Sequence, residues 1–137
     1  MSPASPALPQ GIPSCLKKRQ LLNDKVLSPD LCREYGRKFL ELGWREDALE
    51  FFKKGGVAEE LEKLKAYCLE TGDAFLLARI GKQEPEVWRR LAERALALGK
   101  LHFARRAFEL AGDDDKTGMV AGLIAGQPMG ADQASDN

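Results

Sequence analysis

The side chains that could carry out acid–base or nucleophilic chemistry are few in this chain. His102 is the only histidine, and no serine or cysteine stands at a spacing that would pair with it as a nucleophile. A lone histidine on a helix is mostly a structural or exposed residue. The chain also lacks both phosphate-binding glycine motifs, G-x-x-x-x-G-K-[ST] and G-x-G-x-x-G. We therefore predict a protein that is not an enzyme and needs no cofactor.

The densest group of potential metal ligands is the run Asp113, Asp114 and Asp115. Three adjacent acids point in different directions, and they lack the alternating ligands and central glycine of a calcium loop. Negative charge at this place is instead favoured by the dipole of a helix that starts there. We predict no metal site.

The cysteines give no framework for metal or disulfide bonds. Cys15, Cys32 and Cys68 are odd in number, far apart, and contain no C-x-x-C pair. A reducing cytoplasm is the simplest location for such a chain. Cys32 and Cys68 fall on apolar helix positions, where a free cysteine behaves as a small buried hydrophobe.

The charges balance over the whole chain but not along it. The net charge is zero, which removes the general attraction on which nucleic-acid and membrane-surface binders rely, and favours a protein partner. Residues 41–62 carry seven acids and three bases, and residues 79–112 carry eight bases and four acids. The acidic and basic ends could meet head to tail between molecules, or both could be ordinary solvated surfaces. The longest apolar run, Met119–Ala125, is too short for a membrane span of about 20 residues.

The elements that position these side chains repeat along the sequence. Residues 29–56 can be laid over residues 85–112 without a gap. In this overlay Pro29 meets Pro85, Gly43 meets Gly99, Ala48 meets Ala104, Phe52 meets Phe108 and Gly56 meets Gly112. Self-similarity at a fixed period indicates a helical repeat array, which buries a core by stacking and exposes a continuous surface for a macromolecule.

Caps, apolar periodicity and glycines predict the helices. We expect them over residues 14–23, 29–42, 44–54, 57–71, 73–80, 85–98, 101–111 and 113–126. The glycines that close the first helix of each pair, and then the last helix, are Gly43, Gly72, Gly99 and Gly126, which are almost evenly spaced. The fold class we predict is all-α, a short right-handed α-solenoid of about three antiparallel helical hairpins plus a C-terminal capping helix. This domain, residues 14–126, lies between a disordered Pro-rich arm (1–13) and a disordered tail (127–137).

Apolar residues at helical spacing give the expected core faces. The residues assigned to these faces include Leu31, Cys32, Tyr35, Phe39 and Leu42 in the first hairpin, Phe75, Leu76 and Leu77 in the second, and Trp88, Leu91, Ala92, Ala95 and Leu98 in the third.

Two of the hairpins resemble the tetratricopeptide (TPR) repeat. The third reads Trp88-x2-Leu91-Ala92-x2-Ala95 and then Ala104-x3-Phe108; the first reads Cys32-x2-Tyr35-Gly36-x2-Phe39 and then Ala48-x3-Phe52. The family pattern is W-x2-L-G-x2-Y followed by A-x3-F and a closing Pro, over about 34 residues. Here the closing Pro is absent, the middle hairpin lacks the Ala and Phe landmarks, and the step is shorter. Such short hairpins are also similar to the solenoid tails of vesicle-coat and ciliary-transport proteins.

The resemblance implies a TPR-like adaptor or assembly subunit that binds a peptide or protein on the concave face, formed by the first helix of each pair. The residues that this face would offer are Asp30, Arg33, Arg37 and Leu40 from the first hairpin and Glu86, Arg89, Glu93 and Leu96 from the third. Arginine can hold a carboxylate through two parallel hydrogen bonds, so Arg33, Arg37 and Arg89 would suit an acidic peptide or a chain terminus. The alternative is that these residues are simply solvated.

Two further surfaces stay open at this level. An RNA-binding repeat protein could use the arginines of the third hairpin, Arg89, Arg90, Arg94, Arg105 and Arg106. In the last helix Gly118, Gly122 and Gly126 recur every four residues beside Met119 and Leu123. That flat stripe would dock the helix tightly on the third hairpin or form the seam of a homodimer.

Overall fold

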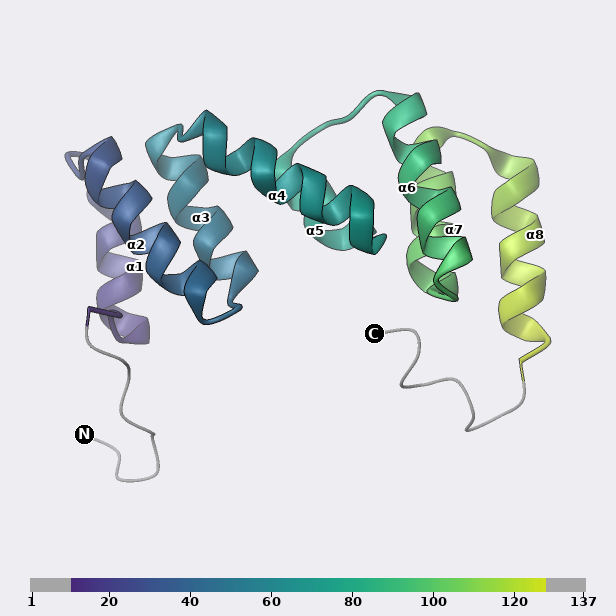
Figure 1. Cartoon of the computed structure of the whole chain (residues 1–137), viewed down its shortest axis with the longest axis horizontal. Helices are drawn as coiled ribbons and strands as arrows, with labels where there is room; N and C mark the ends of the chain where they lie inside the picture. Colours follow the sequence, from purple (N-terminus) through teal and green to yellow (C-terminus); the bar gives the residue numbers. More distant parts are fainter. Residues whose placement is uncertain (1–10, 128–137) are drawn as a thin grey trace. The chain divides into compact units, whose positions relative to one another are not determined.

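The computed structural model describes residues 11–127, which form eight α-helices and no strand within that range (Figure 1). The helices are α1 (Cys15–Asn23), α2 (Pro29–Glu41), α3 (Arg45–Gly55), α4 (Ala58–Thr71), α5 (Ala74–Ile80), α6 (Pro85–Ala97), α7 (Leu101–Ala111) and α8 (Asp114–Ala125). The all-α class predicted from the sequence is confirmed. Both ends of each predicted helix lie within two residues of the ends of the corresponding observed helix.

Short polar side chains start several of the helices. The Ser14 hydroxyl accepts a hydrogen bond from the Lys17 amide at 3.2 Å, and Ser28 does the same for Leu31 at 3.2 Å. The carboxylates of Asp73 and Asp113 accept from the amides of residues 76 and 116. These bonds satisfy amide groups that have no partner within the helix.

Glycine ends the first helix of each of the two similar hairpins. Gly43 has φ +79° and Gly99 has φ +75°, in the left-handed region that other residues rarely adopt. The amide of the next residue then donates to a carbonyl five positions back, from Trp44 to Phe39 and from Lys100 to Ala95. Gly126 differs, since its φ is −84° in the right-handed region, so the fourth glycine of the predicted series does not end its helix in this way.

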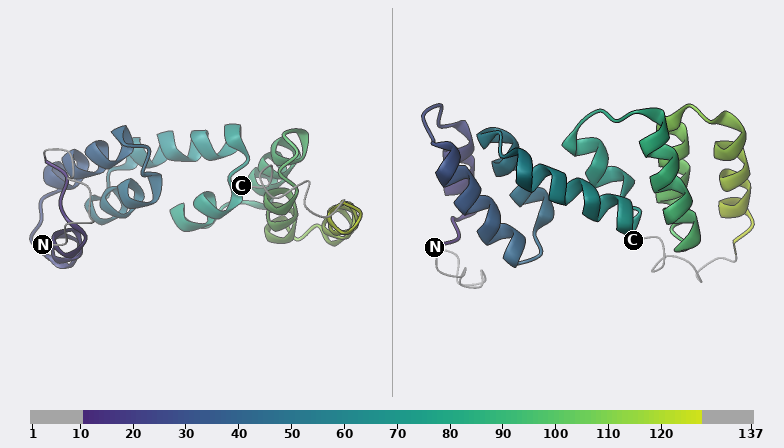
Figure 2. Two further views of the ribbon diagram at one scale, coloured as in Figure 1. Left: turned by 90° about the horizontal axis from the view of Figure 1, so that it is seen from below. Right: turned by 45° about the horizontal axis from the view of Figure 1, so that its top comes forward.

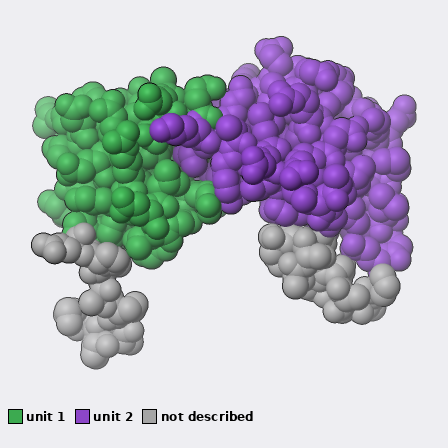
Figure 3. Space-filling model, viewed as in Figure 1, with its two compact units in different colours: residues 1–62 green, residues 63–137 purple. Residues whose placement is uncertain are grey.

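The chain divides into two compact units, residues 1–62 (unit 1) and 63–137 (unit 2) (Figure 3). The sequence had predicted one repeat domain over residues 14–126. Within each unit the helices contact mainly their neighbours along the chain, α2 with α3 in unit 1, and α6 with α7 and α7 with α8 in unit 2 (Figure 2). Each hairpin therefore builds much of its own core.

The helix boundaries extend the internal repeat beyond the stretch seen in the sequence. Helices α2 and α6 start at Pro29 and Pro85, α3 and α7 at Arg45 and Leu101, and α4 and α8 at Ala58 and Asp114, so all three pairs are separated by the same distance along the chain. The helix before each hairpin also takes an equivalent place, because α1 contacts α3 and α5 contacts α7. The constant shift thus extends over α2–α4 and α6–α8, and a helix that contacts the second helix of the hairpin precedes each set.

An aromatic core holds the α2–α3 hairpin of unit 1. Phe39 stacks on Phe51 with ring centroids 5.7 Å apart, and Tyr35 lies 5.4 Å from Phe51. Gly36 makes room for Phe52, since a Cβ at residue 36 would lie 2.3 Å from the ring. The missing side chain therefore lets the two helices approach closely.

Smaller residues fill the equivalent hairpin of unit 2. Ala95 and Ala107 stand where unit 1 has Phe39 and Phe51, and Trp88 is buried on the same helix as Ala95. The turn after α4 packs directly against this helix, because a Cβ at Gly72 would lie 2.7 Å from the Ala95 Cα. Small side chains thus open the hairpin to a neighbouring element.

Some of the predicted core residues are exposed. Leu31, Leu42, Phe75 and Leu98 have 37 to 50% of their surface accessible. Leu42 and Leu98 are the residues just before the closing glycines, where the chain leaves the helix and turns outward. Helical spacing alone placed them on the apolar face, but the end of the helix removes them from it.

Cys32 and Cys68 are buried as predicted. Burial also raises the pKa of the Cys32 thiol, although Lys54 nearby acts in the opposite direction.

The predicted flexible ends lie mostly outside the described residues. Of the arm at 1–13, Gly11, Ile12 and Pro13 are described, and Ile12 is buried, so packing begins slightly before the predicted boundary. Of the tail at 127–137, only Gln127 is described, and its amide donates to the carbonyl of Ile124 at 3.2 Å.

Candidate functional site

Three of the predicted binding residues lie together on one side of α2. A shallow hollow of about 360 Å³ is lined there by Asp30, Arg33, Glu34, Arg37, Lys38 and Glu41. Arg33 donates to the Asp30 carboxylate at 3.3 Å, in an ion pair between residues one helical turn apart. Both of these side chains are well exposed, so water screens their attraction and the pair is weak.

Arg37 makes a firmer contact than the sequence indicated. Its guanidinium donates to Glu60 at 3.0 Å from Nε and 2.8 Å from Nη2. The Glu60 side chain is only 4% exposed, although it belongs to the first turn of α4. Two donors to one carboxylate oxygen give a strong charge-assisted contact. Arg37 therefore links α2 to the start of α4 rather than standing free for a ligand.

The three predicted residues of unit 2 lie on α6. Arg89 donates to Glu86 at 3.1 Å, and both side chains are exposed. Glu93 accepts from Lys116 of α8 at 3.0 Å. This hydrogen bond, more than any other influence, raises the pKa of Lys116. The two predicted sets occupy separate units.

The ion pairs repeat with the same shift as the helices. Asp30–Arg33 recurs as Glu86–Arg89, and Arg37–Glu60 recurs as Glu93–Lys116 with the charges exchanged. Sequence reasoning missed Glu60 and Lys116, because the overlay was ended at Gly56 and Gly112. Continuing the overlay for one more helical turn would have aligned Glu60 with Lys116. It would then have shown that residues 37 and 60, and likewise residues 93 and 116, carry opposite charges at the same separation in the sequence.

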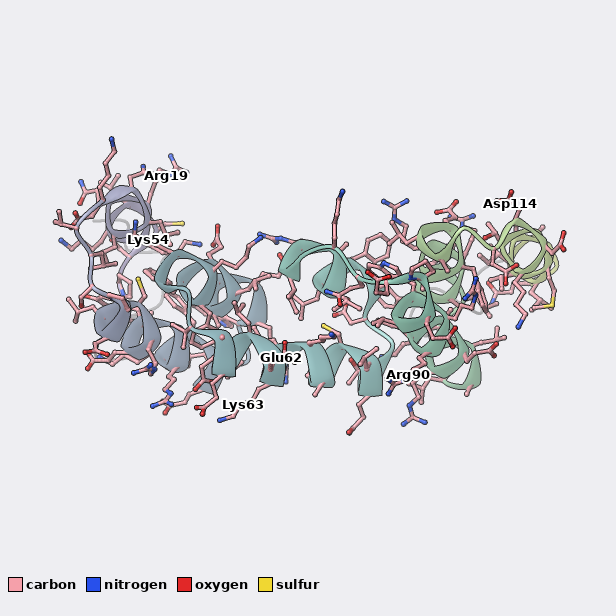
Figure 4. The ribbon with its side chains drawn as sticks, turned by 90° about the horizontal axis from the view of Figure 1, so that it is seen from above. Arg19, Lys54, Glu62, Lys63, Arg90 and Asp114 are labelled. Carbon is pink, nitrogen blue, oxygen red and sulfur yellow. The ribbon has the colours of Figure 1, made fainter. Side chains whose placement is uncertain are left out.

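The arginines of the RNA-binding alternative are partly committed within the chain. Arg94 donates to the carbonyl of Glu70 at 2.7 Å, and Arg106 pairs with Glu109 at 3.4 Å. Lys100 similarly donates to the carbonyl of Thr71 at 2.6 Å. Arg90 is exposed on α6 (Figure 4). Arg94 and Lys100 thus hold the last carbonyls of α4, where the helix dipole favours positive charge.

The glycine stripe of α8 does not dock that helix on the third hairpin. Val120 is buried and α8 contacts α7, but Gly118 and Gly122 are exposed, and a Cβ at either residue would meet nothing within 4 Å. Met119 is exposed as well. The last helix does pack on the third hairpin as predicted, but through Val120, and it turns the glycines to a different side. The homodimer seam stays a prediction.

Two other hollows mark the described surface. One of about 560 Å³ lies at the α2–α3 turn and is lined by Cys15, Gly43, Trp44, Arg45, Glu46 and Asp47. The other, about 470 Å³, is lined by Ala78, Gly81, Lys82, Gln83, Trp88 and Leu110. Across residues 11–127 we find no group of three or more His, Cys, Asp or Glu side chains arranged to hold a metal ion.

None of the helices in the described part of the chain has both the length and the apolar character needed to cross a membrane.

Comparisons with protein-family models, with curated proteins and with solved structures gave no match to this chain. The structure itself defines the class, an all-α protein in which a helical hairpin and the helix after it occur twice at one constant shift.

Proposed function

We propose that this chain is a non-enzymatic, TPR-like adaptor or assembly subunit of the cytoplasm that binds an acidic peptide or protein segment. The arrangement we propose is a right-handed solenoid, in which the first helix of each hairpin offers its outer face to the partner. The repetition of helix starts, closing glycines and ion pairs supports a repeat protein, because stacked repeats of this kind expose extended binding surfaces.

The single observation that carries the proposal is the hollow on α2 with Arg33 at its side. Arg33 is held by an exposed partner within its own helix turn, at 3.3 Å. Such a pair stabilises the fold by little, so an incoming carboxylate can replace Asp30 at small cost. Arg89 on α6 has the same kind of partner in Glu86. These two arginines are therefore the available ones of the predicted set.

Arg37 and Glu93 have a different role in this proposal. Each forms an ion pair between the first helix of a hairpin and the helix that comes after that hairpin, α2 with α4 and α6 with α8. They fix the position of the binding helix, while Arg33 and Arg89 contact the ligand. The residues that the sequence analysis grouped as one binding set therefore have two roles, positioning and ligand contact.

The test is a titration of short labelled peptides, acidic, basic and neutral, followed by fluorescence polarisation. We expect the acidic peptides to bind, and the double substitution Arg33→Glu and Arg89→Glu to abolish that binding through charge repulsion. Arg106→Glu is the matched control, because Arg106 has an exposed i,i+3 partner in Glu109 but lies on the second helix of its hairpin. Helical circular dichroism should be unchanged in both variants.

Equal binding of acidic and basic peptides, or full binding by the double variant, would refute the arginine assignment. Binding of a single-stranded RNA that weakens steeply with added salt would favour the RNA-binding alternative instead.

A further inference from the structure

Helix α8 exposes an apolar face at positions where its counterpart α4 is charged. When the two repeats are aligned by their helix starts, Glu62 and Lys63 of α4 correspond to Gly118 and Met119 of α8. Both α4 residues are exposed (Figure 4). Met119 and Leu123 on α8 are each 49% exposed. One place in the repeat thus carries a solvated face in α4 and an apolar one in α8.

The residues next to this face are also less covered in α8 than in α4. Cys68 of α4 is completely buried, whereas its counterpart Ile124 is only partly buried. Helix α4 is followed by α5 after the short turn Gly72-Asp73, which reverses the chain direction. Within the described residues no helix follows α8 in the same way, so its face stays uncovered there.

Helix α1 also has a face that no helix covers within the described residues. It contacts α3 as α5 contacts α7, and at the shift of the other helices Gln20 of α1 aligns with Leu76 of α5, although the starts of α1 and α5 do not keep that shift. Leu76 is buried, while Gln20 is exposed. On α1, Leu16 is also 67% exposed and Arg19 points outward (Figure 4). Within the described residues, no helix precedes α1 as α4 precedes α5.

The two uncovered faces match when the helices run antiparallel. Along α1, Leu16 lies near the start and Arg19 at the middle of the helix, and the exposed Lys25 follows its end. The face of α8 has exposed acids, Asp114 and Asp115, at its start and Leu123 near its end. Antiparallel packing brings apolar residues together at one end and opposite charges together at the other.

We propose that α1 of one copy of this chain packs antiparallel on the apolar face of α8, at Met119 and Leu123, of a second copy. The contact is head to tail, since it joins the α1 surface of one copy to the α8 surface of the other, and it differs from a seam of α8 on α8. Short helices of 9 and 12 residues bury a small area, and association is correspondingly weak and dependent on concentration.

Disulfide trapping between two differently tagged copies tests the contact. Both copies carry Cys15→Ser, which removes the exposed native thiol, while Cys32 and Cys68 are buried. One copy adds Leu16→Cys and the other adds Leu123→Cys. We expect mild oxidation of the mixture to give mainly the mixed dimer. Leu16 and Leu123 are exposed, so these substitutions leave the core intact.

The matched control replaces Leu123→Cys with Asp114→Cys, at the other end of α8. The two positions are separated by about 13 Å along the helix axis, beyond the reach of one disulfide. We expect little mixed dimer from this pair. Preferential trapping by Asp114→Cys would overturn the antiparallel register. A predominance of Leu123→Cys homodimer would show a symmetric α8–α8 seam and overturn the head-to-tail contact.

Sedimentation velocity on the full native chain gives a second readout. We expect the mean mass to rise with concentration, and Arg19→Glu to reduce that rise. Mixing Arg19→Glu with a chain carrying Asp115→Arg should restore association between the two variants. A chain that stays monomeric at all concentrations, as when its own residues 128–137 or another protein cover α8, would refute the proposal.

Discussion

The hairpins α2–α3 and α6–α7 have equivalent helices and different interiors. Phe39 and Phe51 fill the first hairpin with stacked rings, where the second has Ala95 and Ala107. At Ala95 the second hairpin instead receives the turn at Gly72. Side-chain size at a few positions thus decides whether a hairpin closes on itself or receives a neighbour.

The residue after the closing glycine shows the same division. In unit 1 it is Trp44, which stacks on Phe39 with ring centroids 5.8 Å apart. In unit 2 it is Lys100, which donates to the Thr71 carbonyl at the end of α4. One hairpin uses the position for a ring contact within the hairpin, and the other uses it for a contact with the preceding helix.

Removing a ring from the aromatic core should have the largest effect on stability. Phe51→Ala leaves a cavity among buried rings, and we expect the free energy of unfolding to fall by about 3–5 kcal/mol. Urea denaturation followed by circular dichroism measures this change. Phe75→Ala is the control, because Phe75 is half exposed and meets Phe103 edge-on. Equal losses in the two variants would contradict the closed core of unit 1.

Adding one carbon at Gly36, where α2 and α3 are in close contact, should have the second largest effect on stability. Gly36→Ala forces its Cβ into the buried Phe52 ring, and we expect a loss of about 1–3 kcal/mol. Gly118→Ala is the matched control, since it is helical and nothing lies within 4 Å of its Cβ. That substitution should raise stability by about 0.5–1 kcal/mol. Stabilisation by both would show that α2 and α3 are not in close contact at Gly36.

The contact made by Lys100 is the counterpart test in unit 2. Lys100→Met removes a charged donor from the Thr71 carbonyl, and we expect a loss of about 1.5 kcal/mol in the free energy of unfolding. Lys100→Arg keeps a donor in reach and should recover most of it. If the Lys100→Met and Lys100→Arg variants have the same free energy of unfolding, the hydrogen bond does not hold α7 to the end of α4.

The two bridging ion pairs should differ because their carboxylates differ in burial. Arg37→Gln removes the charge that faces the buried Glu60, and we expect a loss of about 1 kcal/mol. Lys116→Gln faces the exposed Glu93 and should change stability less. Thermal melts of the two variants at low and high salt compare them. A larger effect at Lys116 would reverse the ranking.

The smallest expected effect is a pH dependence that arises in unit 1. Burial lowers the pKa of Lys18, but its hydrogen bonds to Asp47 and Glu50, at 2.5 and 2.9 Å, outweigh burial and raise it overall. A raised pKa in the folded state means that the stabilisation is complete below the ordinary lysine pKa. It is then lost as the pH rises through the folded-state value. Denaturation midpoints should therefore fall at high pH, and Lys18→Met should flatten this decline.

Much of the helical framework could be predicted from local sequence signals. Ser28, Pro29 and Gly43 mark the ends of α2, because capping and positive φ depend on the residues themselves. The overlay of the first and third hairpins also predicted that Ala48 and Ala104 face the core, and both are buried. Such signals act within a few residues and need no knowledge of the rest of the fold.

The candidate site was predictable only in part. Placing Asp30, Arg33 and Arg37 on one face follows from helical spacing, and the hollow on α2 contains all three. That Arg37 is bound by Glu60 does not follow, because the partner lies far along the chain on another helix. The exposure of Leu31 was missed for the same reason, since burial depends on what packs against a face.

The sequence by itself determined the helical class, the helix ends and the internal repeat, because caps, glycines and apolar spacing act through local geometry. Only the tertiary structure decided which arginines are bound within the chain and which apolar faces stay uncovered. Those properties depend on contacts between helices that are distant in sequence. The contrast between the exposed charges of α4 and the exposed apolar residues of α8 belongs to this second kind, because which side of each helix is covered depends on its neighbours.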